Sequence, residues 1–334
     1  MPYRAAVVGC GQIGLLFDED SSQIRPATHT AALSMNPRTE LVALVDDKPE
    51  KLQRAAERYP GVPRFADCGE MLEAVRPELV AVATPPETHR KLVEQCATGG
   101  VRAIVCEKPI ALDLEDARRM VDGCAAAGVL LFVNHTRRFD PLIRRAREAV
   151  AAGAIGDVLQ AMCVYTRGVM NNGTHLLDLL RFFLGDATAV WGVSKGSVDV
   201  PLPEDMAVDG RVEFAGGALA TIHHVDDGVF DVTLIGHRGE LALTQVGFRL
   251  EWTYVRRRAD GSGELDPAER RAEGEQRSFM AAMVDHVVAC CDGREKPVSR
   301  GEDGRAALAL VWALRKSADL GGVRVPVAAE RSGK

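Results

Sequence analysis

The sequence lacks several features that mark common classes of protein. No hydrophobic run reaches the roughly 18 residues that a membrane-spanning helix needs, so we expect no membrane partner. The eight cysteines include no CxxC spacing, which argues against a zinc knuckle or a disulfide framework and favours a reducing compartment. The net charge of −6 includes no strongly basic block, so nucleic acid is not an expected partner. The N-terminus shows no charged and apolar leader, and we therefore expect a cytoplasmic protein.

What the sequence does contain is enough apolar material for two cores. Its 334 residues are 46% hydrophobic, and at about 150 residues per domain we expect two domains. In residues 1–133, short apolar runs alternate with longer stretches that carry helix caps and glycine or proline stops. Strands are predicted at residues 4–8, 41–45, 79–83, 103–106 and 129–133, and helices at residues 49–58, 86–98 and 113–127. The alternation predicts parallel βαβ units, and hence a doubly wound α/β sheet.

The pattern changes in residues 134–334, which we expect to form a second, α+β domain. Strands are predicted there at residues 190–196, 207–214, 218–225, 230–235 and 240–244, with glycine or aspartate turns between them. Helices are predicted at residues 141–153, 174–184, 278–290 and 304–320. Residues 256–276 are charged and glycine-rich, and we expect a solvated loop. Consecutive strands on one face of a few helices indicate antiparallel pairing.

A glycine motif follows the first predicted strand. In Gly9-x-Gly11-x-x-Gly14, the first glycine permits a tight turn, the second lets the backbone approach a pyrophosphate, and the third lets helix and strand pack closely. This is the dinucleotide-binding fingerprint of a Rossmann domain, and it places Gln12 and Ile13 at a helix start that favours phosphate. The motif alone is weak, and an unliganded turn remains the alternative.

An acidic residue at the end of the second strand is expected to recognise the adenine ribose. The Asp46 carboxylate would accept hydrogen bonds from ribose hydroxyls and repel a 2′-phosphate, so we expect NAD rather than NADP. The alternative is that Asp46 only caps the next helix. Asp46 lies 32 residues after Gly14, whereas the usual spacing is about 20 residues. We attribute the excess to residues 17–28, an acidic, turn-rich insertion that interrupts the first helix.

Three further motifs follow the glycine turn in a specific order. They are TPPETH at residues 84–89, CEKP at residues 106–109 and GTHLLD at residues 173–178. Together the set resembles the glucose–fructose oxidoreductase / inositol dehydrogenase (Gfo/Idh/MocA) family over nearly the whole chain. The resemblance implies a Rossmann domain plus an α/β domain with a large, mostly antiparallel open sheet. It also implies hydride transfer between a nicotinamide and a hydroxyl or keto carbon of a sugar or cyclitol. The exposed sheet face that we expect in the second domain favours a homodimer or homotetramer.

The resemblance also implies the catalytic residues. Lys108, just past the fourth predicted strand, corresponds to the family's catalytic lysine. A free lysine titrates near 10.4, so it acts as a base only if its pKa is lowered; if it stays protonated, it stabilises alkoxide charge. His175 corresponds to an acid/base or substrate ligand, and Asp178, one turn on, would orient it or cap the helix. Many members have aspartate where this chain has Asn171, which cannot take a proton; the identity of the base is therefore open.

The other candidate residues surround these groups. Thr84, Pro85 and His89 lie in the loop after the third predicted strand and are expected near the cofactor, although His89 could equally be structural. Glu107 is expected to contact the nicotinamide ribose or to orient Lys108. Arg138 and Arg167 are candidate anchors for an anionic substrate, with a structural role as the alternative for each.

We expect no metal. His223 and His224 are adjacent on a predicted strand, so they point to opposite faces and do not form a ligand pair.

Several functions are compatible with these residues. The leading interpretation is an NAD-dependent sugar or cyclitol dehydrogenase. A biosynthetic keto-sugar (nucleotide-sugar) reductase uses the same chemistry in reverse. An NAD-dependent glycosidase would recycle a tightly held cofactor, and a non-catalytic NAD-binding regulator would need neither Lys108 nor His175.

Overall fold

The computed structural model describes residues 1–327 except 201, 203 and 227. The chain forms two compact units. The first unit comprises Met1–Asp140 and Arg277–Arg305, and the second comprises Pro141–Gln276 and the described residues from Ala306 onward. Arg277–Arg305 thus packs with the first unit, although the sequence analysis placed it in the domain of residues 134–334. Among the described residues, none of the helices has the length and apolar character needed to cross a membrane.

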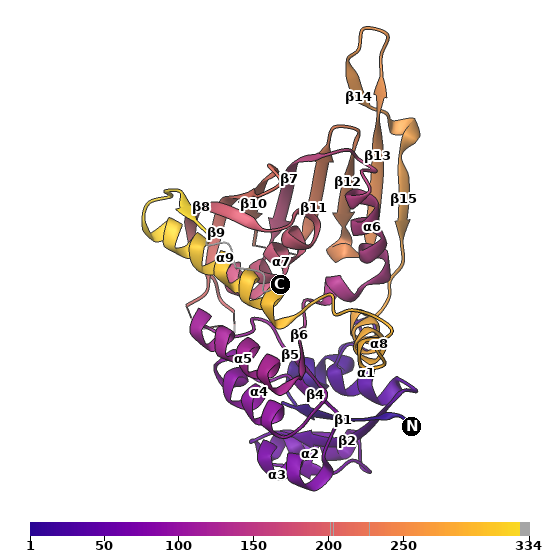
Figure 1. Ribbon diagram of the computed structural model, residues 1–334, viewed down its shortest axis with the longest axis vertical. Helices are drawn as coiled ribbons and strands as arrows, with labels where there is room; N and C mark the ends of the chain where they lie inside the picture. The colour runs from indigo at the N-terminus through magenta and orange to yellow at the C-terminus, as the bar shows by residue number, and fades with distance from the viewer. Residues whose placement is uncertain (201, 203, 227, 328–334) are drawn as a thin grey trace. The chain divides into compact units, whose positions relative to one another are not determined.

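The first unit is built on a six-stranded sheet. Its strands are β1 (Tyr3–Val8), β2 (Thr39–Val45), β3 (Arg64–Phe65), β4 (Leu79–Val82), β5 (Ala103–Cys106) and β6 (Leu130–Val133). All neighbours pair in parallel, in the order β3-β2-β1-β4-β5-β6 (Figure 1). This is the doubly wound Rossmann order, so the predicted fold class is confirmed. The strand order reverses between β1 and β4, and ligands bind such sheets at the carboxyl ends of the strands beside that reversal.

Helices cover both faces of this sheet, as the apolar strands require. They are α1 (His29–Met35), α2 (Pro49–Arg58), α3 (Cys68–Val75), α4 (His89–Thr98), α5 (Leu114–Ala127) and α8 (Phe279–Cys291). Short 3₁₀ turns are η3 (Pro86–Thr88) and η4 (Thr136–Phe139). Strand β3 and helix α3 were not predicted. The Asp113 side chain accepts the N–H of Asp116, so the predicted cap of α5 is confirmed.

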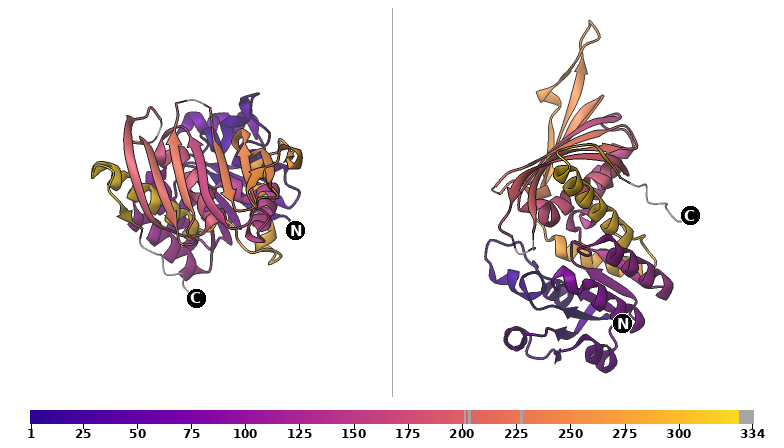
Figure 2. Two further views of the ribbon diagram at one scale, coloured as in Figure 1. Left: turned by 90° about the horizontal axis from the view of Figure 1, so that it is seen from above. Right: turned by 90° about the vertical axis from the view of Figure 1, so that its left-hand side faces the viewer.

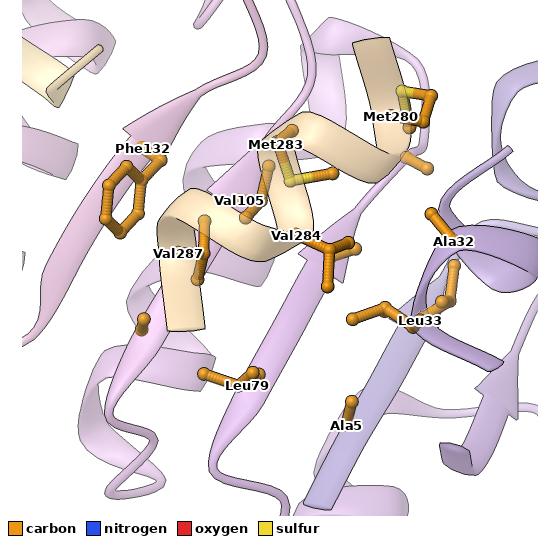
Figure 3. Close-up of a cluster of buried hydrophobic side chains, with 14 of the residues drawn as sticks. Ala5, Ala32, Leu33, Leu79, Val105, Phe132, Met280, Met283, Val284 and Val287 are labelled. Atoms are coloured by element: carbon orange, nitrogen blue, oxygen red, sulfur yellow. The ribbon is translucent and has the colours of Figure 1, made fainter. Parts of the chain in front are cut away.

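Helix α8 joins the core of the first unit although it is distant in sequence. Its side chains Met283, Val284 and Val287 lie beside Leu79 and Val105 of the sheet (Figure 3). These residues are all buried. Burial of apolar area of this kind is the main favourable term that holds α8 to the sheet.

The first helix is interrupted as predicted. A π-helical turn, η1 (Gln12–Leu16), leads into a 3₁₀ turn, η2 (Phe17–Glu19), and α1 begins only at His29. The insertion is anchored by the buried carboxylate of Asp18, which accepts the N–H of Ala27 at 2.9 Å and the hydroxyl of Thr28. Thr28 in turn caps α1 by accepting the N–H of Ala31. The acidic insertion therefore fixes the position at which α1 starts.

The second unit is built on a ten-stranded sheet. Its strands are β7 (Val158–Tyr165), β8 (Ala187–Ser197), β9 (Met206–Phe214), β10 (Leu219–His224), β11 (Asp231–Gly236), β12 (Gly239–Thr244), β13 (Arg249–Arg257), β14 (Gly263–Leu265), β15 (Arg271–Gly274) and β16 (Val325–Pro326). The order is β14-β13-β12-β11-β7-β10-β9-β8-β16, with β15 also paired to β13. Within this sheet, β7 and β10 are the only two described neighbours that pair in parallel. The predicted, mostly antiparallel open sheet is confirmed.

Helices of the second unit lie on one face of this sheet. They are α6 (Pro141–Ala151), α7 (Gly173–Leu184) and most of α9 (Gly301–Asp319), and a π-helical turn, η5 (Gly168–Asn172), precedes α7. The left view of Figure 2 looks onto the strands, with α9 in yellow behind them. Buried and partly exposed residues alternate along β11 and β12, as expected for a sheet covered on one side.

The prediction of a loop at residues 256–276 was wrong. The segment forms β14, a 3₁₀ turn at η7 (Pro267–Glu269) and β15, and both strands pair with β13 (Figure 1). Polar pairs hold these strands: Arg256 donates to Glu264 at 2.8 Å, and the Trp252 indole donates to Glu273 at 3.1 Å. Because the strands carry little apolar alternation, their sequence resembles that of a solvated loop.

Candidate functional site

The glycine turn has the geometry of a phosphate-binding loop. Gly9 has φ +104°, and a Cβ there would overlap the Ala83 carbonyl; a Cβ at Gly14 would overlap the carbonyl of Gly9. These two glycines are therefore required by packing within the protein. At Gly11 the nearest atom to a Cβ would be Lys51 Nζ at 3.8 Å, so internal packing does not require this glycine.

The glycine turn leads into the first turn of η1. The Gly11 carbonyl accepts backbone hydrogen bonds from the N–H groups of Leu15 and Leu16. Gln12 and Ile13 therefore lie in the first turn of η1, where backbone N–H groups have no partner within the helix.

Asp46 is buried at the carboxyl end of β2 and is held by three donors. One carboxylate oxygen accepts the N–H of Cys10 at 2.8 Å, and the other accepts the N–H of Lys48 at 3.0 Å. Lys51 Nζ lies 3.4 Å from the first of these oxygens. The bond to Lys48 organises the turn before α2, so part of the capping alternative holds. Each carboxylate oxygen accepts more than one hydrogen bond, which leaves Asp46 able to bind ribose hydroxyls.

These residues fit a dinucleotide. A turn with open backbone at Gly11 suits a pyrophosphate, and a buried acid one strand away suits a ribose. All of these residues belong to the first unit.

His89 connects the two loops at the carboxyl ends of β4 and β5. The ring is fully buried: Nδ1 lies 3.1 Å from the carbonyl oxygens of Pro109 and Ile110, and Nε2 lies 2.9 Å from that of Thr84. Burial lowers the pKa of His89, and these carbonyls oppose the shift. The contacts favour the structural alternative for His89, which ties the Thr84 loop to the loop after Lys108. Pro85, next to Thr84, is exposed.

Glu107 is a buried carboxylate held by several donors. It follows β5 directly and is buried. Its Oε1 accepts a hydrogen bond from Asn134 at 2.6 Å and lies 2.9 Å from His29 Nε2, while its Oε2 accepts the N–H of Lys108 at 3.2 Å. Burial alone would raise the pKa of Glu107, but the hydrogen bond and charge of His29, the hydrogen bond from Asn134 and the charge of Lys108 bring it to about 2. Glu107 is therefore an ionised carboxylate inside the protein.

Lys108 is partly buried at the same strand end. The carboxyl ends of β1, β2, β4 and β5 carry the glycine turn, Asp46, Thr84 and Lys108 respectively. The structure thus brings the predicted cofactor residues and the predicted catalytic lysine to one edge of one sheet. Sequence reasoning missed His29 and Asn134, whose partner Glu107 is remote along the chain.

The remaining predicted site residues lie in the second unit, on η5 and α7. Asn171 is in η5, and His175 and Asp178 are one turn apart at the start of α7. Asn171 and His175 are partly exposed, and Asp178 is buried. Arg167 is exposed, with φ +61°, immediately before η5.

A buried aspartate that sequence reasoning missed anchors η5. One oxygen of Asp205 accepts the N–H of Met170 at 2.9 Å, and the other accepts that of Asn171 at 2.9 Å. At Gly168, φ is +78° and a Cβ would overlap this carboxylate. Burial raises the pKa of Asp205, and the backbone N–H groups oppose the shift. Asp205 thus fixes the backbone from which Asn171 projects.

Arg138 is buried in the first unit and has internal partners. Its Nη1 donates to the Val298 carbonyl at 3.0 Å and lies 3.3 Å from the Asp303 carboxylate. These contacts favour the structural alternative for Arg138.

Comparison with known proteins identifies the family to which this architecture belongs. The sheet order and the glycine turn define the class of dinucleotide-binding Rossmann proteins. Residues 3–135 match the model of the Gfo/Idh/MocA oxidoreductase family's NAD-binding Rossmann fold, and residues 166–327 match its C-terminal alpha/beta domain. The chain belongs to this family of NAD-binding oxidoreductases, as the resemblance predicted.

Individual relatives span almost the whole chain. The D-apiose dehydrogenase of Paraburkholderia graminis is 30% identical, over 95% of this chain and 88% of its own length. The inositol 2-dehydrogenase of Rhizobium meliloti is 31% identical, over 95% of this chain and 97% of its own length. Among solved structures, the WlbA dehydrogenase of Bordetella pertussis, in complex with NADH and UDP-GlcNAcA, has a TM-score of 0.80 at 24% identity and covers 98% of this chain and 99% of its own. At that identity the likeness concerns the fold.

Proposed function

We propose that this oxidoreductase is an NAD-dependent dehydrogenase that acts on a hydroxyl carbon of a sugar or cyclitol. The observation that carries the proposal is Lys108, placed next to the ionised Glu107 on the sheet edge that also holds the glycine turn. The names of the two relatives, an apiose and an inositol dehydrogenase, support the substrate class.

The reaction divides between the cofactor and the protein. When bound, the oxidised nicotinamide would accept a hydride, that is, one proton with two electrons, from the carbinol carbon. The hydroxyl group then loses a proton as the C=O bond forms, and the protein must accept it. In the proposal Lys108 hydrogen-bonds the reacting oxygen and His175 relays the proton at neutral pH.

Glu107 supports the lysine in this scheme. A fixed negative charge beside Lys108 favours the ammonium form. Lys108 then acts mainly by stabilising negative charge on the substrate oxygen, which leaves the proton to His175. Asn171 donates and accepts hydrogen bonds but takes no proton, so its proposed role is to orient the substrate. Arg167 is the proposed anchor for an anionic substituent, because its side chain is exposed.

We propose NAD rather than NADP as the cofactor. The support is the buried Asp46 carboxylate at the end of β2, which faces the ribose position in Rossmann domains and would repel a 2′-phosphate.

The test measures reduced-cofactor formation with a panel of polyols and cyclitols, using NAD and NADP separately. Lys108→Met should lower kcat/KM at least about 100-fold on every productive substrate, because a positioned polar group at the reacting oxygen is lost. His175→Ala should lower kcat by a similar factor, with a change in its pH dependence. The matched control is Lys296→Met, which removes an exposed ammonium of the first unit and should leave kcat/KM unchanged. Equal activity of wild type and Lys108→Met would refute the catalytic role of Lys108.

We also propose that the chain forms a homodimer or homotetramer through the open face of the ten-stranded sheet. Met162 on β7 and Val193 on β8 are 57% and 59% exposed, which is unusual for apolar residues in strands. Light scattering at micromolar concentration should give a multiple of 36.0 kDa. A monomer would refute this proposal without affecting the proposed reaction.

A further inference from the structure

His29 is a buried histidine that the proposed reaction does not use. It is the first residue of α1, and its start is set by Thr28, which caps the helix from a position tied to Asp18. The ring is completely buried. It borders a cavity of about 10 Å³ whose other lining includes Leu33, Val105 and Val284. The residue that follows the insertion therefore places an imidazole beside a cavity whose other lining residues are apolar.

Only one edge of this ring meets a polar partner. Nε2 lies 2.9 Å from Glu107 Oε1, whereas Nδ1 has no hydrogen-bond partner within the described parts of the chain. Because an ionised carboxylate only accepts hydrogen bonds, Nε2 must carry the proton, whether the ring is neutral or charged. The hydrogen bond from Nε2 to Glu107 is therefore the polar contact that the His29 ring makes among the described residues.

The same carboxylate also holds the backbone of the proposed catalytic lysine. Oε1 takes donors from His29 and Asn134, which leaves Oε2 turned toward the N–H of Lys108. If either donor to Oε1 is lost, the carboxylate is free to rotate about its last bond, and the acceptor for the Lys108 N–H moves with it.

We propose that His29 is a positioning residue for Lys108: by donating to Glu107 Oε1, it fixes the buried carboxylate that orients the Lys108 backbone at the end of β5. The inference rests on the proposed function of Lys108. It assigns a role to a residue outside the sequence motifs, at the start of the helix that Asp18 and Thr28 anchor.

The charges around Glu107 set the expected pH behaviour. The titratable groups that face it are His29 on α1, Lys108 beside it, His89 on α4 and Cys106 on β5. In the wild type, hydrogen bonds and charge outweigh burial, and the pKa of Glu107 is about 2. Without His29, we expect burial to outweigh the remaining donors, so that the folded-state pKa of Glu107 rises above the value near 4.3 of an unfolded glutamate.

The test uses His29→Leu, which keeps the ring's approximate volume but has no donor. Apparent melting temperatures of the cofactor-free protein are measured at pH 4.5 and pH 7.5. A raised folded-state pKa destabilises the protein as pH rises from the unfolded value through the folded one. The deficit of His29→Leu relative to wild type should therefore grow, by about 4 °C or more, between the two pH values. In a Glu107→Gln background the growth should be smaller, because only the contribution of the His29 imidazole itself remains.

Two further variants separate positioning from packing. His29→Gln restores an N–H donor of similar reach, and it should recover most of the kcat that His29→Leu loses, a loss of about 10- to 100-fold. The matched control is His286→Leu: His286 on α8 is also buried and also contacts a glutamate, Glu295 at 2.9 Å, but the Glu295 side chain is 36% exposed. This variant should leave kcat unchanged, although it removes a buried imidazole of the same unit.

The outcomes are distinct. A His29→Leu deficit that does not grow with pH, or a His29→Gln variant as impaired as His29→Leu, overturns the role of His29. If His29→Leu does not fold, ¹⁵N NMR of the wild type decides, because His29 Nε2 must be protonated from pH 6 to pH 8; an unprotonated Nε2 overturns the inference. Full activity of Lys108→Met would instead refute the proposed function, and the melting comparison would still stand.

Discussion

Two buried carboxylates, one in each unit, anchor the backbone beside a proposed catalytic residue, yet their pKa values move in opposite directions. Glu107 supports Lys108 in the first unit, and its pKa falls to about 2. Asp205 supports Asn171 in the second unit, and its pKa is raised. Both are almost fully buried, so burial pushes the pKa of each one upward.

The difference lies in the donors. Glu107 receives hydrogen bonds from two side chains, His29 and Asn134, and the charges of His29 and Lys108 lower its pKa further. Asp205 receives backbone N–H groups, with the charge of Arg315 as a smaller contribution. Neutral amides offset part of the cost of burying a charge, and a side-chain network with an adjacent cation offsets all of it. The first carboxylate is thus built to stay ionised, and the second serves mainly as a hydrogen-bond acceptor.

Replacement of Glu107 by Gln should have the largest effect. A folded-state pKa of about 2 against an unfolded value near 4.3 corresponds to about 3 kcal/mol of stability. That contribution is complete above pH 4.3 and is lost as the pH falls toward 2. The stability deficit of Glu107→Gln should therefore grow from pH 2 to pH 5 and then remain constant, as measured by denaturant unfolding at several pH values.

The control for this variant is Glu295→Gln, which alters a second histidine–glutamate pair of the first unit. Because the Glu295 side chain is 36% exposed, its removal should cost well under 1 kcal/mol. A deficit for Glu107→Gln as small as that for Glu295→Gln would break the distinction between the two carboxylates.

The fold could be predicted where the signals are local. The strands of the first unit are short apolar runs bounded by glycine, proline and capping residues, and β5 has the predicted bounds, residues 103–106. The cap at Asp113 depends only on the next three residues. By contrast, β14 and β15 were missed because their stabilising pairs are charged or polar and lie on β13. The packing of α8 into the first unit arises from contacts with strands far away in the sequence.

The site divides in the same way. Motifs that follow a strand, such as the glycine turn and residues 106–109, could be found because their chemistry depends on adjacent residues. His29 and Asp205 could not be found in this way, because their partners are distant in sequence. Glu107 lies 78 residues after His29, and Asn171 lies 34 residues before Asp205. A lone buried histidine or a loop aspartate carries no local signal. The roles of Lys108 and His175 stay predictions that the variants above test.

Asp205→Asn should have the smallest effect and the opposite dependence on pH. The Asn carbonyl oxygen still accepts the N–H of Met170, but its NH₂ group faces the N–H of Asn171, so the loss is about 1 kcal/mol, offset in part because no charge is buried. A raised folded-state pKa means that wild type is favoured most below the unfolded value near 3.9 and loses that advantage as pH rises. The deficit of Asp205→Asn should therefore shrink from pH 3.5 to pH 7, whereas that of Glu107→Gln grows over the acid range. Urea unfolding of both variants across this range checks the two slopes, and slopes of the same sign would show that backbone donors and side-chain donors hold a buried carboxylate equally well.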